Sequence, residues 1–174
     1  MFKTRLTLLL LLVFTAVPAQ KQKNVYQEKV KDLDSIIETL YDVISGEKGI
    51  ERDWDLFKYL FHPKAKLIPS RQTDDGSMSL KFMSPKDYIK ASGNWLVENG
   101  FFEKEIHREV DVFGNIAHVF STYASFQKQN DSTPFIRGIN SIQLLNDGER
   151  WWIVNIYWMN ESEEHPIPQK YLPN

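Results

Sequence analysis

The sequence predicts a single α+β domain, with helices in the first half of the chain and an antiparallel sheet in the second half. Two patterns carry this prediction. Apolar side chains recur at steps of three and four residues from Val30 to Ile44, which is the spacing of one helix face. Polar and apolar residues also alternate on both sides of two turns, at 114–115 and 147–148, and this pattern is typical of β-hairpins.

The composition narrows the class of protein. The chain has 174 residues, of which 42% are hydrophobic and 25% charged, so one domain with a sizeable core is expected. The net charge is -2 and no long basic run occurs, which argues against a nucleic-acid partner. The absence of cysteine excludes disulfides and thiolate chemistry. The four histidines show no metal-site spacing, so we expect neither a metal nor another cofactor.

The N-terminus has the pattern of a cleavable export signal. Lys3 and Arg5 precede an apolar run, and small residues end at Ala19. The apolar run is about half as long as the ~20 residues that a spanning helix needs, so cleavage is favoured over anchoring. We expect a signal peptide at 1–19, a flexible segment at 20–29, and a secreted or periplasmic protein with no membrane contact after cleavage. Intact-mass analysis of the exported protein tests this, since retention of residues 1–19 contradicts it.

Three helices are expected in the first half of the chain. The first covers 30–44 and ends near Gly46, a residue favoured at helix C-termini. The second covers 53–61, where aromatic side chains share one face and Pro63 stops the helix. The third starts at Ser84, because a hydroxyl N-cap, a proline and an acid at the third position occur together, and it runs to about residue 100.

Strands are expected at 65–69, at 78–83 and in the two hairpins. Successive side chains of a strand point to opposite faces of the sheet, so the pairing around each turn predicts which residues share a face. In the first hairpin, the face toward the helices should collect Ile106, Arg108, Val110, Val112, Ala117, Val119, Ser121 and Tyr123. The outer face should collect Glu103, Glu105, His107, Glu109, Asp111, His118, Phe120 and Thr122. In the second hairpin, the inner face should collect Gly138, Asn140, Ile142, Leu144, Trp151, Ile153, Asn155 and Tyr157.

The segments LFHPKAKL, SPKDYIKA, FGNIAHVF and LLNDGERWWIV, in this order, resemble the NTF2-like superfamily and within it the SnoaL-like group. The resemblance covers a domain at 30–161 and leaves a C-terminal tail at 162–174. It implies a cone, in which a curved antiparallel sheet wraps around the three helices and encloses a ligand cavity. It also implies a homodimer through the outer sheet face. Members of this superfamily include isomerases, dehydratases, cyclases, binding modules and interaction domains, so the fold alone does not decide the function.

Polar residues predicted on the inner sheet face need an explanation, because an unpaired buried polar group costs about 1 to 3 kcal/mol. Either they satisfy one another or they contact a ligand. Aromatic side chains from the helices would then wall the same cavity, although aromatics at helical spacing also serve as plain core. The candidate ligand-binding residues are Arg108, Tyr123, Asn140, Asn155, Tyr157, Trp54, Tyr88 and Trp95.

Arg108 is the most specific of these candidates, because its guanidinium has no neutral form and needs an anion or water. Three partners are open: an internal acid such as Asp53 or Asp55, a ligand carboxylate or enolate, and solvent at the rim of the sheet.

The predicted inner face offers no carboxylate, which argues against isomerase chemistry. His62, Asp53 and Asp55 are the remaining weak candidates for a catalytic base.

The sequence therefore favours binding of a small apolar or aromatic molecule in the cavity. A lyase or isomerase of the SnoaL, ketosteroid isomerase or scytalone dehydratase type is an alternative, and whether the protein is an enzyme stays open. Another is an interaction module or homodimer through an outer apolar band, namely Trp152, Val154, Ile156 and Trp158.

Overall fold

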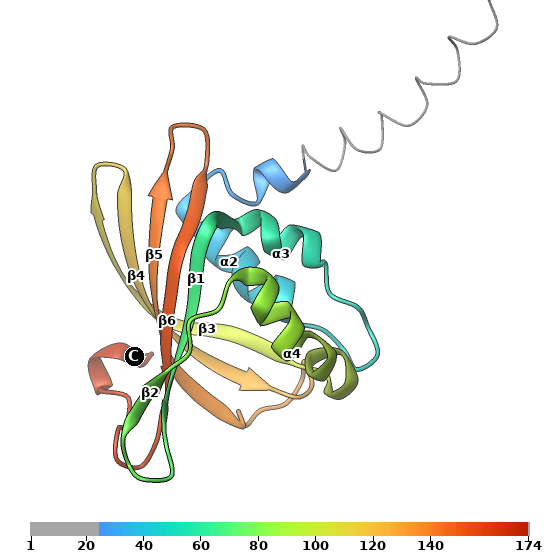
Figure 1. The fold of residues 1–174 in the computed structure, drawn as a ribbon, viewed down its shortest axis with the longest axis vertical. Helices are drawn as coiled ribbons and strands as arrows, with labels where there is room; N and C mark the ends of the chain where they lie inside the picture. The colour runs from blue at the N-terminus through green and yellow to red at the C-terminus, as the bar shows by residue number, and fades with distance from the viewer. Residues whose placement is uncertain (1–24, 174) are drawn as a thin grey trace, which may run out of the picture.

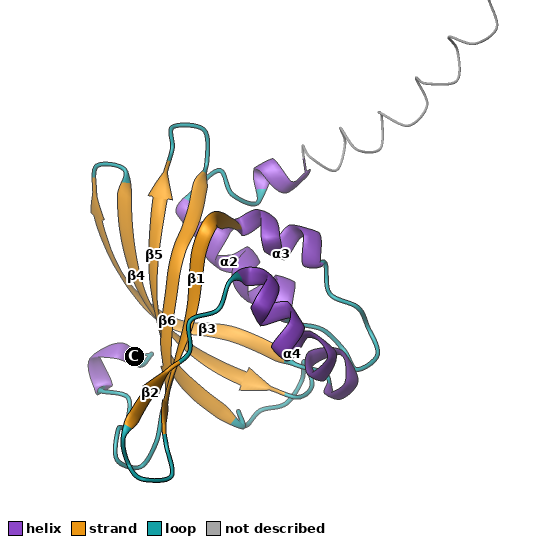
Figure 2. Cartoon of the chain, in the orientation of Figure 1, coloured by secondary structure: helices purple, strands orange, loops and turns teal. Residues whose placement is uncertain are grey.

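The computed structural model describes residues 25–173, so the predicted signal peptide lies outside the described residues. In the part of the chain that the structure describes, a helical turn at 25–28 precedes three longer helices and six strands. Figure 2 shows how the helices and strands are arranged. The helices are α2 (Leu33–Ile44), α3 (Trp54–Leu60) and α4 (Pro85–Asn99). The strands are β1 (Phe61–Gln72), β2 (Met78–Leu80), β3 (Phe102–Phe113), β4 (Ile116–Phe126), β5 (Ile136–Asn146) and β6 (Trp151–Asn160), and a short 3-10 helix follows at Gln169–Tyr171.

All six strands form one sheet, in the order β2-β1-β6-β5-β4-β3. Neighbouring strands are antiparallel, except that β1 runs parallel to β6. Figure 1 shows α2, α3 and α4 on one side of the curved sheet and the C-terminal end of the chain on the other. The α+β prediction is confirmed, with a sheet that is mostly rather than wholly antiparallel.

The helix ends follow the local sequence. Asp32 caps α2 by accepting a hydrogen bond from the backbone N–H of Ser35 at 2.7 Å. Ser84 and Asp87 form a capping box at the start of α4, with Pro85 in the first turn, which confirms the predicted start of that helix. These caps fix where each helix begins and therefore which side chains face the sheet.

The core lies between the helix layer and the inner face of the sheet. From α2, Ile36 and Ile37 are fully buried. From the sheet, Val119, Ile142 and Ile153 are equally buried and belong to the same apolar cluster. Burying each such side chain contributes roughly 1.5 to 3 kcal/mol to stability. Among the described residues, no helix is long and apolar enough to cross a bilayer.

A bulge in β3 corrects the predicted faces of that strand. Between the turn and Arg108 the pairing is as predicted, with Arg108 opposite Ser121. The next two pairs are His107 with Thr122 and Glu105 with Tyr123, so Ile106 is an extra residue without a partner. The prediction that Ile106 lies opposite Tyr123 is therefore wrong. The extra residue reverses the alternation, and Glu105 and Glu103 point toward the helices instead of outward.

A second bulge reverses β6 in the same way. Leu144 pairs with Ile153 and Gln143 pairs with Asn155, so Val154 is the extra residue. Ile156 is buried, and Trp158 lies opposite the inward-facing Asn140. The predicted inward placement of Asn155 and Tyr157 and the predicted outward placement of Ile156 and Trp158 are both wrong for this reason.

The C-terminal segment covers part of the outer sheet face. Thr122 Oγ1 donates a hydrogen bond to the carbonyl of Tyr171 at 2.7 Å, and the Tyr171 ring packs edge-on against Phe120 at 4.9 Å. Ile167 is buried. Because the C-terminal segment covers part of the outer face and Ile156 and Trp158 point inward, less apolar area is exposed there than the sequence predicted.

Candidate functional site

A cavity of about 220 Å³ lies between the helices and the inner face of the sheet. Helices α2, α3 and α4 and strands β1, β3, β4, β5 and β6 all contribute to it. Aromatic side chains form much of its wall, namely Phe57, Tyr88, Trp95, Phe101, Phe135 and Trp158. The polar residues that line it are Ser92, Glu103, Tyr123, Ser125, Asn140 and Asn160. Glu103 is the one charged side chain among the described residues of this wall.

Glu103 combines burial with neutral partners. Ser125 Oγ donates a hydrogen bond to Glu103 Oε2 at 3.0 Å. Burial raises the pKa of Glu103 to about 7, while hydrogen bonds from Ser125 and Asn140 act in the opposite direction. A carboxyl group with this pKa is present in both protonation states near neutral pH, as a proton donor or acceptor in catalysis needs to be.

Two tyrosines lie close enough to Glu103 for its charge to raise their pKa values further, after burial as the main cause. Tyr123 donates its hydroxyl hydrogen to Asn160 Oδ1 at 2.6 Å. Tyr88 stacks on Phe57, with ring centroids 5.3 Å apart. Among residues 25–173, the structure gives no hydrogen-bond partner for the Tyr88 hydroxyl, which leaves it available to a bound molecule.

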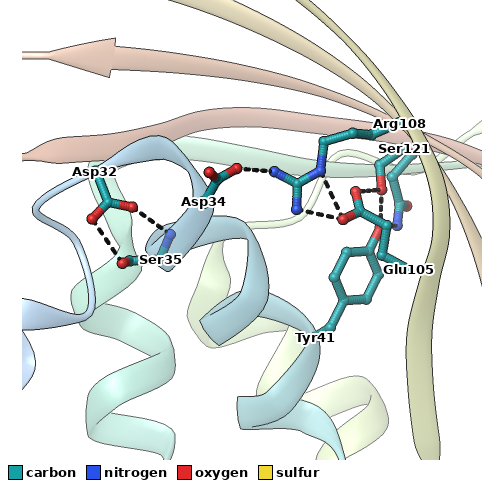
Figure 3. Close-up of polar contacts among 8 residues, drawn as sticks. Asp32, Asp34, Ser35, Tyr41, Glu105, Arg108 and Ser121 are labelled. Carbon is teal, nitrogen blue, oxygen red and sulfur yellow. Dashed lines mark hydrogen bonds and ion pairs between the residues drawn. The ribbon is translucent and has the colours of Figure 1, made fainter.

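Glu105, two residues further along the strand, belongs to a different environment (Figure 3). Arg108 donates to Glu105 through Nε at 2.7 Å and also through Nη2, and its Nη1 donates to Asp34 at 2.6 Å. The other oxygen of Glu105 accepts a hydrogen bond from Ser121. Arg108 is therefore held by two acidic side chains, and it does not line the cavity.

The hydrogen bonds continue inward from Glu105 in one direction. The paired carboxylate only accepts, so Ser121 donates to it and the Tyr41 hydroxyl donates to Ser121 at 2.6 Å. Asn140 Nδ2 then donates to Tyr41 at 3.1 Å. This chain satisfies Arg108, Ser121 and Asn140, three of the polar residues that the sequence placed on the inner face.

The structure brings four of the predicted ligand-binding residues together on the cavity wall: Tyr88, Trp95, Tyr123 and Asn140. Four others lie elsewhere. Arg108 pairs with Glu105 and Asp34 instead of Asp53 or Asp55. Asn155 bonds to Gln143 on the outer face, and Tyr157 there is 41% exposed. Trp54 packs against Phe57 and Gly93 without lining the cavity.

The three weak candidates for a catalytic base have other contacts and do not line the cavity. Asp53 is the N-cap of α3 and accepts from the Leu56 N–H at 2.8 Å. Asp55 is exposed and pairs with Lys58. His62 accepts a hydrogen bond from the Lys64 N–H at 3.2 Å.

Sequence reasoning missed Glu103, because simple alternation places it on the outer face. The bulge residue is an isoleucine, and no glycine marks the position. Among residues 25–173, no group of three or more histidine or acidic side chains has an arrangement that could hold a metal ion.

Several solved structures share this fold. An NTF2-like protein of unknown function from Silicibacter pomeroyi aligns over 81% of this chain and 98% of that chain, with 17% identity and a TM-score of 0.52. A putative ketosteroid isomerase from Parabacteroides distasonis aligns over 79% and 98%, with 12% identity and a TM-score of 0.53. The protein LinA aligns over 84% and 90%, with 4% identity and a TM-score of 0.53.

The protein therefore has the NTF2-like fold, as the sequence motifs indicated. Models of known protein families give no match, and neither do curated protein sequences. At these identities the likeness establishes the fold and leaves the reaction or ligand to the site itself.

Proposed function

We propose that the protein binds a small, mostly apolar, ring-bearing molecule in the cavity, with Glu103 as the polar anchor. One observation carries the proposal: an aromatic-walled cavity contains a single charged group. Ligand sites are typically apolar with a few convergent polar groups, and the cavity has this composition. Its volume of about 220 Å³ lies below the ~300 to 1,000 Å³ of sites for drug-sized ligands, so a ligand of one or two rings is favoured.

The position of Arg108 argues against an anionic ligand. The sequence left a ligand carboxylate, an internal acid and solvent open as partners of this residue, and in the structure its Nε, Nη1 and Nη2 groups all donate to Glu105 and Asp34. A carboxylate in the cavity would instead face Glu103, at a cost from like-charge repulsion.

A cavity-filling variant tests the binding proposal. Ser92→Phe places a ring in the cavity from α4, while Ala91→Phe on the same helix adds the same bulk at an exposed position. Calorimetric titration with 2-phenylethanol and 2-phenylethylamine should show binding to the wild type and to Ala91→Phe, and a loss of at least tenfold in Ser92→Phe. Unchanged affinity in Ser92→Phe contradicts the proposal.

A second candidate function is proton transfer, as in a lyase or isomerase, and the pKa of Glu103 near 7 favours it. As a carboxylate, Glu103 would take a proton from the carbon between the carbonyl group and the C=C bond of an unsaturated ketone. Once protonated, it would return the proton to the far carbon of that C=C bond, so that the double bond becomes conjugated with the carbonyl group. The Tyr88 hydroxyl would then bond to the carbonyl oxygen. The sequence argued against isomerase chemistry because no carboxylate was predicted on the inner face, and Glu103 now supplies one. One solved structure with this fold is a putative ketosteroid isomerase.

The isomerisation of 3-cyclohexenone to 2-cyclohexenone, followed by ultraviolet absorbance, tests this candidate. Glu103→Gln should lower the rate by roughly 10² to 10⁴-fold, the usual contribution of a general acid–base group. Glu105→Gln removes an equal charge outside the cavity and should retain the rate. A wild-type rate equal to that of buffer removes this candidate for enones.

The homodimer through the outer sheet face stays a proposal, and the structure supports it less than the sequence did. Of the four β6 residues that suggested it, Trp152 and Val154 remain outside, and Trp152 is engaged by Arg150, whose guanidinium lies 3.7 Å from its ring centre. Light scattering at micromolar concentration decides between one and two chain masses.

A further inference from the structure

We propose that the ligand of the cavity is a small protonated amine, whose ammonium group pairs with Glu103 and whose hydrocarbon part packs on the aromatic wall. This inference rests on the proposed binding function and names the chemical class of the ligand. Four properties of the site support it: the missing counter-charge of Glu103, the direction of the hydrogen bonds around it, the aromatic wall, and the charges of its surroundings.

Glu103 has neutral partners only, among the residues that the structure describes. Its carboxyl group contacts the Ser125 hydroxyl and the Asn140 amide. The nearby basic residues are engaged elsewhere: Lys104 donates to the carbonyl of Gln129 at 3.1 Å, and Arg108 pairs with Glu105. An ionised carboxylate without a counter-charge is costly in a low-dielectric site, and an ammonium group would supply the missing charge.

The hydrogen bonds around Glu103 leave acceptors, which suit a ligand rich in donors. Ser125 donates its hydrogen to Glu103, and Tyr123 donates its hydrogen to Asn160. The lone pairs of both hydroxyl oxygens therefore remain as acceptors on the cavity wall. An ammonium group has three donors and no acceptor, and it matches this arrangement.

The aromatic wall favours a cation over a neutral polar group. Tyr88 and Tyr123 both lie within electrostatic range of Glu103. A cation over the face of an aromatic ring gains about 0.5 to 2 kcal/mol, depending on how far it is desolvated. Glu103 and these rings line the same cavity, so a cation paired with Glu103 would lie in an aromatic-walled space.

On the side of Glu103 away from the cavity, acidic residues outnumber basic ones. Glu103 also lines a neighbouring surface cleft formed by α2 and β3. The acids of that cleft outnumber its two basic residues; its charged residues are Asp34, Glu38, Asp42, Glu103, Lys104, Glu105 and Arg108. An excess of acids on one side attracts a cation and repels an anion.

The affinity for an amine should depend on pH through Glu103. The titratable groups around it are Tyr41 from α2, Tyr88 from α4, Tyr123 from β4 and, across the cleft, Asp34, Glu38 and Asp42 from α2 and Lys104, Glu105 and Arg108 from β3. Burial raises the pKa of each tyrosine, so all three stay neutral below pH 8. Glu105 is paired with Arg108. An amine of the lysine type, with a pKa of about 10.4, also stays charged, so its affinity follows the ionised fraction of Glu103.

Three probes with the same phenylethyl group separate the possible charges: 2-phenylethylamine, 2-phenylethanol and 3-phenylpropanoate. Titration calorimetry of the wild type at pH 8 should show the amine binding roughly tenfold to a hundredfold more tightly than the alcohol. Because burial raises the pKa of Glu103 to about 7, the amine should bind about tenfold more weakly at pH 6 than at pH 8. Glu103→Gln should abolish the preference for the amine, and Glu105→Gln should keep it.

The outcomes distinguish this inference from the proposed function. Equal binding of the alcohol and the amine at pH 8, or a preference that persists in Glu103→Gln, overturns the amine assignment and leaves ligand binding intact. Failure of all three probes to bind overturns the proposed function itself. If Glu103→Gln does not fold, the pH dependence of the wild type still decides, since a flat profile contradicts the inference.

Discussion

Glu103 and Glu105 lie two residues apart on β3, and the same bulge turns both toward the helices. Their environments differ. Glu105 meets Arg108, Ser121 and, through Arg108, Asp34. Glu103 meets two neutral groups and opens on an aromatic cavity.

The comparison shows that inward position alone does not make a functional carboxylate. Glu105 has its charge neutralised by the fold, so it serves structure. Glu103 has a raised pKa and no counter-charge among the described residues, so its ionisation works against the folded state. Groups of this kind are candidates for binding or catalysis, because the protein retains them at a cost to stability.

The largest expected effect concerns the pH dependence of stability. The pKa of Glu103 rises from 4.5 to about 7 on folding, so the folded state binds its proton more tightly than the unfolded state. The stabilisation is complete below pH 4.5 and is lost as pH rises to about 7, a difference of about 3 kcal/mol. Glu103→Gln should remove this slope and exceed the wild type in stability at pH 8, measured by urea unfolding from pH 4 to 8. Parallel wild-type and variant profiles would refute the raised pKa.

Arg108→Met should have the next largest effect, with the opposite sign. It keeps much of the side-chain volume but leaves Glu105 unpaired and partly buried. We expect a loss of about 2 kcal/mol in the free energy of unfolding, below the ~3 to 5 kcal/mol of a fully buried pair, because the Arg108 side chain is 23% exposed.

Urea unfolding measures this loss, and Lys58→Met, which breaks an exposed pair with Asp55, is the control with little change expected. Probe binding to the cavity should stay the same in Arg108→Met. A loss of binding with unchanged stability would return Arg108 to the ligand site.

Tyr41→Phe should cost about 1 to 2 kcal/mol. The hydroxyl links Ser121 to Asn140, and its removal leaves the Asn140 amide without one acceptor in a buried place. Thermal or urea unfolding measures the change, and Tyr157→Phe on the outer face is the matched control. An unaltered midpoint of unfolding in Tyr41→Phe would show that the hydrogen bonds from Glu105 to Asn140 do not stabilise the fold.

Asp34→Asn should have the smallest effect, about 0.5 kcal/mol or less. The Asp34 side chain is 90% exposed, and Arg108 retains its contact with Glu105. The difference from the wild type should vanish in ~1 M salt, where surface charges are screened. A loss as large as that of Arg108→Met would mean that Asp34, rather than Glu105, is the main partner of Arg108.

The sequence determined the order of the elements, the start of α4 and the fold class, although the strand that it placed at 65–69 begins at Phe61, directly after α3, and includes Pro63. Helical spacing placed α2, the Ser84 capping box placed α4, and the two turns fixed the pairing next to each hairpin end. These features depend on residues close to one another in the chain, which is why they could be predicted. The motifs also indicated the NTF2-like fold correctly.

Only the tertiary structure decided which residues form the site. Alternation predicts strand faces as long as the pairing is regular, and one extra residue reverses every position beyond it. Ile106 and Val154 are such residues, and both are β-branched residues of the kind that is ordinary in a regular strand. They bring Glu103 and Trp158 to the cavity and take Asn155 and Tyr157 away from it. A bulge is set by how the curved sheet closes around the helices, and local sequence alone does not encode that closure.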